Sequence, residues 1–237
     1  MKFSKIKAIT VLLCIIITVT GCGVIQITDE NKSIASINPE DPTNRALFES
    51  WSPLAFCGGQ TLSYNFEISG GKYTVNGNFI LSVQGKNESR LKFDWQFNIG
   101  KETDNGSFRG SSADFVRKLK EYCKESSVKS MVYQSIFTTY EGAAMYNSLV
   151  ANDKPLEIGM IWHTSYQGQK YEHSLLSVDS YGLIDGFSVS SSVNGVPSQI
   201  ICISPFIPLP SMTMFLTEND SGEPVDIICE LAGAILP

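Results

Sequence analysis

A chain of 237 residues with 24 acidic and 18 basic side chains carries a formal net charge of −6 at pH 7. This acidic balance argues against nucleic acid as a partner, because phosphate backbones are bound through an excess of lysine and arginine. Hydrophobic residues make up 43% of the chain, which is enough for a globular domain with a sizeable core.

The N-terminal segment has the order of features that directs a protein to export. Lys2, Lys5 and Lys7 form a positive region, and residues 8–19 form an apolar run broken only by threonines. The run is shorter than the roughly 20 residues that a transmembrane helix needs, so a removable signal is favoured over a membrane-spanning anchor.

The motif Val19-Thr20-Gly21-Cys22 follows this run and resembles the cleavage and lipidation box of the bacterial-type lipoprotein class. The resemblance implies cleavage before Cys22, lipidation of Cys22 with acyl chains such as palmitate, and an extracytoplasmic location on the cell membrane or outer membrane. Cleavage would leave 216 residues with a net charge of −9, since the leader holds three basic residues and no acidic ones. An ordinary signal peptide and an uncleaved anchor are the alternatives.

The segment that follows is expected to be a flexible tether. Residues 22–50 lack apolar periodicity and include Pro39 and Pro42, which is typical of a linker. About 25 such residues reach roughly 28 Å, so the domain would pivot above the membrane. We therefore expect a signal peptide at 1–21, the tether at 22–50 and a single globular domain at 51–237.

Three strands are predicted at the start of this domain. Apolar residues alternate with polar ones over residues 62–68, 73–83 and 91–99, with short turns between them. This period of two indicates an antiparallel meander with one apolar face and one solvated face.

Helices are then expected to cover the apolar face. Ser111 and Asp114 have the pattern of a helix N-terminus, and the apolar residues of 115–123 follow a helical spacing. A second helical stretch is predicted over 128–150, where Gly142 is a candidate break.

Further strands are predicted near residues 156–163, 171–175, 183–193, 199–203 and 225–231. For the last of these segments, a short helix that starts at Pro224 is the alternative. Asn194-Gly195 is the strongest hairpin signal in the chain. The predicted fold is α+β, with a curved antiparallel sheet of about seven or eight strands and helices packed on one face. A β-sandwich with a helical insertion is the alternative.

Four cysteines lie in the predicted domain, namely Cys57, Cys123, Cys202 and Cys229. An even number in an exported domain suggests two disulfides, and three pairings are possible. Proximity in the sequence favours Cys57 with Cys123 and Cys202 with Cys229. No pair has the CxxC spacing of a zinc site, and no metal or cofactor is expected.

His163 and His173 are weak candidates for a metal site or a general acid/base pair. A three-residue hairpin loop over 167–169 would set them opposite one another, whereas a two- or four-residue loop would set His163 opposite Glu172. Two histidines on the polar face of a strand are more often ordinary surface residues.

Residues 200–216 are almost entirely apolar, yet they include three prolines, Pro205, Pro208 and Pro210. These prolines argue against a helix and against a central strand beyond Ser204. We favour a loop folded onto the core over an apolar surface that contacts a ligand or partner. The candidate ligand-contact residues are Trp95, Trp162, Phe206, Ile207, Leu209, Met212, Met214 and Phe215.

No catalytic or cofactor signature stands out in the mature chain. The sequence therefore favours a non-enzymatic lipoprotein whose domain binds an apolar small molecule or an envelope protein, and which binds no nucleic acid. A hydrolase or metal-dependent enzyme using His163 and His173 is one alternative. A structural role in the envelope is another.

Overall fold

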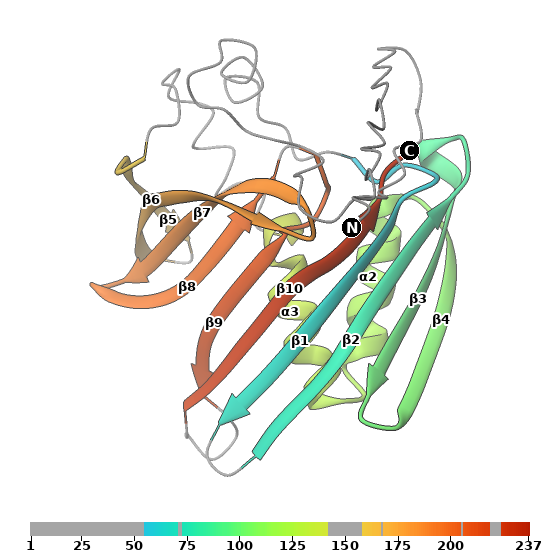
Figure 1. Ribbon diagram of the computed structural model, residues 1–237, viewed down its shortest axis with the longest axis horizontal. Coiled ribbons are helices and arrows are strands. Elements are labelled where there is room, and N and C mark those ends of the chain that lie inside the picture. Colours follow the sequence, from blue (N-terminus) through green and yellow to red (C-terminus); the bar gives the residue numbers. More distant parts are fainter. Residues whose placement is uncertain (1–54, 71–72, 142–157, 167, 205, 219–223) are drawn as a thin grey trace, which may run out of the picture.

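One antiparallel sheet of ten strands, with two helices on one face, forms the body of the protein (Figure 1). The computed structural model describes residues 55–70, 73–141, 158–166, 168–204, 206–218 and 224–237. The predicted α+β class and antiparallel pairing are confirmed. The sheet has more strands than the seven or eight expected. The β-sandwich alternative is wrong, because all ten strands pair within a single sheet.

The ten strands are β1 (Thr61–Gly70), β2 (Tyr73–Gln84), β3 (Leu91–Ile99), β4 (Glu102–Gly110), β5 (Ile161–Tyr166), β6 (Gln169–Tyr181), β7 (Ile184–Val193), β8 (Val196–Ile203), β9 (Met212–Glu218) and β10 (Pro224–Ile235). The helices are α2 (Ser112–Cys123) and α3 (Ser127–Glu141), and η1 (Glu88–Arg90) is a short 3-10 turn. The order across the sheet is β4-β3-β2-β1-β10-β9-β8-β7-β6-β5, so β10 joins the two halves.

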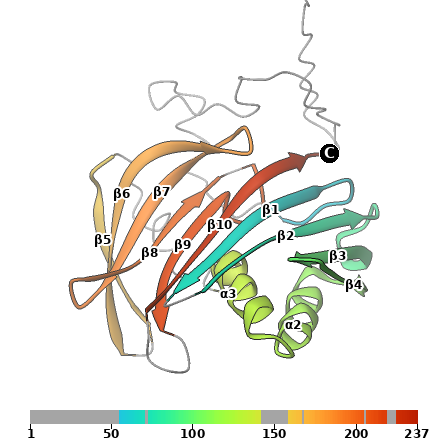
Figure 2. The same cartoon turned by 60° about the horizontal axis from the view of Figure 1, so that its bottom comes forward.

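The first half of the sheet buries one face under the helices, as the alternating sequence predicts. In β1 the buried residues are Leu62, Tyr64, Phe66 and Ile68, and their neighbours on β2, β3 and β10 lie on the same face. The main helix contacts with the sheet are those of α2 with β4 and of α3 with β9 and β10, and both helices lie against this face in Figure 2. Phe115 of α2 stacks on Phe93 of β3 with ring centroids 4.1 Å apart.

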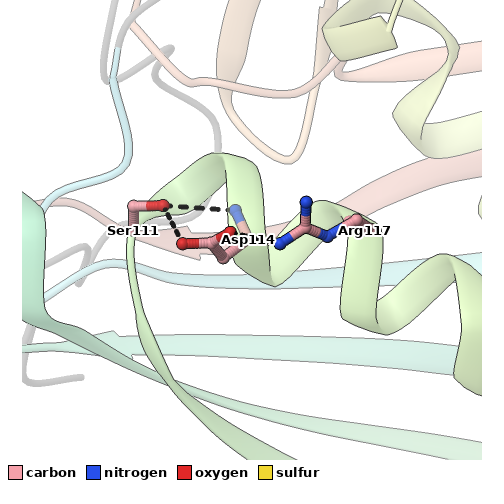
Figure 3. A network of polar contacts seen from close by, with 3 residues as sticks. All are labelled: Ser111, Asp114 and Arg117. Atoms are coloured by element: carbon pink, nitrogen blue, oxygen red, sulfur yellow. Dashed lines mark hydrogen bonds and ion pairs between the residues drawn. The ribbon is translucent and has the colours of Figure 1, made fainter.

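Helix α2 begins where the sequence predicts. The Ser111 Oγ atom accepts a hydrogen bond from the Asp114 backbone N–H at 3.2 Å, and its hydroxyl donates to the Asp114 carboxylate at 2.8 Å (Figure 3). Arg117 pairs with the same carboxylate at 2.6 Å. This cap satisfies a backbone donor that the first helical turn leaves without a partner. The second predicted helix is confirmed up to Glu141, and residues 142–150 lie outside the described part of the chain.

The second half of the sheet curves strongly, as Figure 2 shows for β5, β6 and β7. The β6–β7 turn reaches β10, where a Cβ atom on Gly182 would lie only 2.9 Å from the Leu231 carbonyl oxygen. The predicted Asn194-Gly195 hairpin joins β7 to β8, with φ angles of 52° and 80°. Both values fit the left-handed region that a two-residue turn of this type requires.

Residues 204 and 206–211 belong to the predicted loop folded onto the core. Ile207 and Leu209 are each 2% exposed, and the Tyr64 hydroxyl donates a hydrogen bond to the Pro210 carbonyl oxygen at 2.9 Å. The Ser211 carbonyl oxygen accepts a hydrogen bond from the Leu231 backbone N–H at 2.7 Å, which ties the loop to β10.

The expectation of no central strand beyond Ser204 is wrong, because β9 starts at Met212 and pairs on both sides. All three prolines precede Met212 in the sequence, so none removes a donor from the β9 ladder. The other strand missed by the sequence analysis is β4, an edge strand with few apolar residues.

Candidate functional site

The two histidines lie on opposite faces of the β5–β6 hairpin. In the register of this hairpin, His163 is opposite Glu172 and Trp162 is opposite His173. The exposed His163 ring nitrogen Nε2 lies 3.2 Å from the Glu172 carboxylate. His173 points to the other face and is 2% exposed. The geometry required for a two-histidine metal site or acid/base pair is therefore absent.

A second apolar cluster occupies the face of β5–β8 that continues the helix-covered face. Its buried members are Trp162, Leu175, Phe187, Val189, Ile201 and Ile203, and the partly buried Met160, Val178, Phe206 and Phe215 pack against them. The strand registers place Val189 beside Leu175 on one side and Ile201 on the other. The main contacts of both helices are with other strands. This cluster lies on the curved half of the sheet and adjoins the main core at Phe206 and Phe215, which pack against both.

His173 places a polar group inside this apolar cluster. Its Nδ1 atom lies 2.7 Å from the Ser191 hydroxyl and its Nε2 atom 2.8 Å from the Thr164 hydroxyl. Burial, with a smaller effect of the neighbouring His163, lowers the pKa of His173 from 6.5 to about 4. The imidazole is therefore neutral at physiological pH, with one nitrogen donating and the other accepting.

Trp162 adds a hydrogen-bond donor that has no partner among the described residues. Its indole ring stacks on His173 with centroids 5.2 Å apart, and its Nε1 atom is buried without an acceptor. Buried polar groups are nearly always hydrogen-bonded, so an isolated donor in an apolar cluster is a feature that a bound molecule would satisfy.

The candidate ligand-contact residues separate into three groups. Trp162, Phe206 and Phe215 meet at the second cluster. Trp95, Ile207 and Leu209 belong to the main core, where Trp95 lies against Phe115 and Tyr122 of α2. The register of β9 places Met212 and Met214 on the opposite face of the sheet, since Thr213 and Phe215 face the clusters.

The preferred pairing of Cys202 with Cys229 is wrong. Strand β9 lies between β8 and β10, which separates the two backbones by about 10 Å, beyond the roughly 7 Å limit for a disulfide. Cys202 is opposite Met212 and Cys229 is opposite Thr213, so the two side chains also point to different faces.

Cysteine chemistry does not contribute to a site in the described residues. Cys123 is a buried free thiol, so the predicted bond from Cys57 is absent. Burial raises the pKa of Cys123 to about 12, and those of Cys202 and Cys229 to about 11. These groups are protonated at neutral pH and therefore poor nucleophiles.

Within the described ranges, no cluster of three or more histidine, cysteine or acidic side chains has the geometry to hold a metal ion. A separate search of the same ranges finds no helix with the length and hydrophobicity needed to span a bilayer. Cys22 and the tether lie outside the described residues, so lipidation at Cys22 stays a prediction.

The sequence analysis named Trp162 and His173, but it did not predict the hydrogen bonds of His173 with Ser191 and Thr164. Ser191 and Thr164, which bond His173, come from β7 and β5, and neither has a distinguishing sequence pattern. Only the pairing register brings them together, so no local signal was available to find them.

No protein-family model matches the chain, and no curated protein matches it. Among solved structures, the chain is similar to MucB with a TM-score of 0.37 and 6% identity, over 74% of this chain and 52% of MucB. An outer membrane lipoprotein-sorting protein domain from Vibrio parahaemolyticus gives a TM-score of 0.24 and 8% identity, over 76% of this chain and 85% of that one.

A DUF1329 family protein from Desulfovibrio piger gives a TM-score of 0.20 and 8% identity, over 74% of this chain and 84% of that one. The chain spans about half the length of the MucB chain. At such low TM-scores these likenesses carry no information about function.

Proposed function

We propose that this chain is an exported, lipid-anchored protein whose domain binds an apolar ligand on the curved half of its sheet. The anchor would be the lipid on Cys22, and residues 22–50 would be the tether. The observation that carries the proposal is the second apolar cluster, which forms on β5–β8 away from the main contacts of α2 and α3.

The composition of this cluster suggests an uncharged ligand. His173 is neutral, and the groups that bond it are hydroxyls. Burying a charged ligand group beside them would carry a large desolvation cost with no compensating partner. The Trp162 indole N–H would donate to an acceptor atom, such as a carbonyl oxygen, while Phe206 and Phe215 contact the apolar part.

Native mass spectrometry of the full-length protein extracted in detergent tests this proposal. A bound mass that disappears on denaturation is the expected result. Phe215→Ser should lose this mass, since Phe215 packs on the second cluster, whereas Met214→Ser should keep it. A clean apo mass for the unmodified protein would contradict the apolar-ligand proposal, and an envelope protein partner or a structural role would then be favoured.

Cell fractionation tests the anchor separately. Cys22→Ser should release the protein from the membrane fraction, because several acyl chains would be lost at once. Cys14→Ser, in the leader, is the matched control and should leave the protein in the membrane fraction. Membrane association of Cys22→Ser would refute the lipoprotein assignment.

A further inference from the structure

A second candidate site lies at the other edge of the sheet, where the β3–β4 hairpin meets α3. A cavity of about 390 Å3 is lined there by Phe97, Ile99, Glu102, Thr103, Asp104 and Lys129. This volume is near the lower end of the roughly 300–1,000 Å3 found for small-molecule sites. Strands β4 and β5 are the two opposite edges of the sheet, so this cavity is independent of the second apolar cluster.

On the strand side of the cavity, apolar side chains of β3 are paired across the sheet with acidic side chains of β4. Phe97 is opposite Asp104, and Ile99 is opposite Glu102, so each apolar residue has a carboxylate beside it on the same face. Phe97 is 1% exposed and forms an apolar floor, whereas Glu102 is exposed at the mouth.

Lys129 supplies the only positive charge among the cavity-lining residues. Its ammonium group pairs with the Asp104 carboxylate and lies 5.0 Å from the ring centroid of Tyr122. The Lys129 side chain is only 14% exposed, so its charge is held in place rather than moving freely in solvent. The cavity wall therefore presents a fixed cation and a fixed anion side by side.

The phenol of Tyr122 lies beside this ion pair and supports it. Burial and a hydrogen bond to the Asp104 carboxylate raise the pKa of Tyr122, so the phenol stays protonated and donates to Asp104. The Tyr122 and Trp95 rings are 5.3 Å apart, and neither residue lines the cavity. The charged groups that the cavity itself presents are the Lys129 ammonium and the Asp104 and Glu102 carboxylates.

We propose that this cavity binds a free α-amino acid with an apolar side chain. The ligand carboxylate would accept from Lys129, the ligand ammonium would donate to Asp104 and Glu102, and its side chain would lie on Phe97. A simple anion would be repelled by the two carboxylates, and a simple amine would be repelled by Lys129.

Isothermal titration calorimetry on the full-length protein in detergent tests this proposal with L-phenylalanine and L-leucine. Both should bind with one site per chain. Phenylalanine amide lacks the carboxylate and N-acetylphenylalanine lacks the ammonium, so each should bind about tenfold more weakly or worse. Absence of saturable binding up to about 10 mM amino acid would overturn the proposal, as would equal affinity for phenylalanine and its amide.

Variants assign the binding to this cavity. Lys129→Met and Asp104→Asn should each weaken phenylalanine binding by about tenfold or more. Lys92→Met is the matched control, since Lys92 pairs with Asp94 at 2.7 Å on the opposite face of β3. Circular dichroism would establish that each variant is folded. If Lys129→Met does not fold, the phenylalanine affinity of Asp104→Asn alone decides the assignment. Unchanged binding in a folded cavity variant, or equal loss in Lys92→Met, would refute the assignment.

Discussion

The buried His173 should make the stability of this protein depend on pH in a way that a single substitution removes. The pKa of His173 is lowered from 6.5 to about 4 in the folded protein, chiefly by burial. Between these two pH values the unfolded chain binds a proton that the folded chain does not. The free energy of unfolding should therefore rise with pH across this window and fall as the pH drops from 6.5 to about 4.

The size of the effect follows from the two pKa values. Each pH unit between them corresponds to about 1.4 kcal/mol, so complete protonation of the unfolded state should cost about 3 kcal/mol of stability. The full contribution of His173 is present above pH 6.5. Urea denaturation at a series of pH values, with the free energy of unfolding plotted against pH, measures it directly.

Comparison of two glutamine variants isolates the contribution of His173 from that of the carboxylates, which also titrate at low pH. His173→Gln should be less stable at neutral pH, because Ser191 and Thr164 lose a well-placed partner, but its pH dependence should be shallower by about 3 kcal/mol across the window. His163→Gln changes an exposed side chain and should keep most of the slope. A slope in His173→Gln as steep as in the unmodified protein would refute this reasoning.

Three further predictions concern the helix-covered half and the thiols. Phe115→Ala should lower the free energy of unfolding by about 3–5 kcal/mol in urea, because the side chain is fully buried; a loss below about 1 kcal/mol would contradict the packing described. Ser111→Ala should cost about 1 kcal/mol through loss of the cap, whereas Ser112→Ala should change stability by less than about 0.5 kcal/mol, and equal effects would contradict the capping role. Dithiothreitol should leave the thermal midpoint unchanged, since Cys123, Cys202 and Cys229 are buried free thiols; a fall in the midpoint would reveal a disulfide.

The sequence predicted secondary structure best in segments where burial of one face imposes a regular pattern of apolar and polar residues. Strands β1, β2 and β3 alternate between core and solvent, and the Ser111 cap marks a helix start that the structure confirms. In each case the signal lies within a few consecutive residues. The physical cause is local, because the pleat of a strand and the turn of a helix fix which side chains share a face.

The features that the sequence did not predict depend on residues far apart in the chain. Strand β4 has a polar sequence because it is an edge strand, and charges and glycines are common at edges. Cys202 and Cys229 are near neighbours among the cysteines, yet β9 comes between their strands. Lys129, in the first turn of α3, meets Asp104 of β4 only in the folded chain, and no pattern in either segment predicts that contact.

The position of β10 has a consequence for the order in which the sheet folds. Its neighbours are β1 and β9, so the longest-range pairing in the sheet joins residues 61–69 to residues 226–235. Such a pairing has a high loop-closure entropy and forms slowly. Since β10 follows every other strand in the sequence, the two halves of the sheet have no shared strand until it has been added.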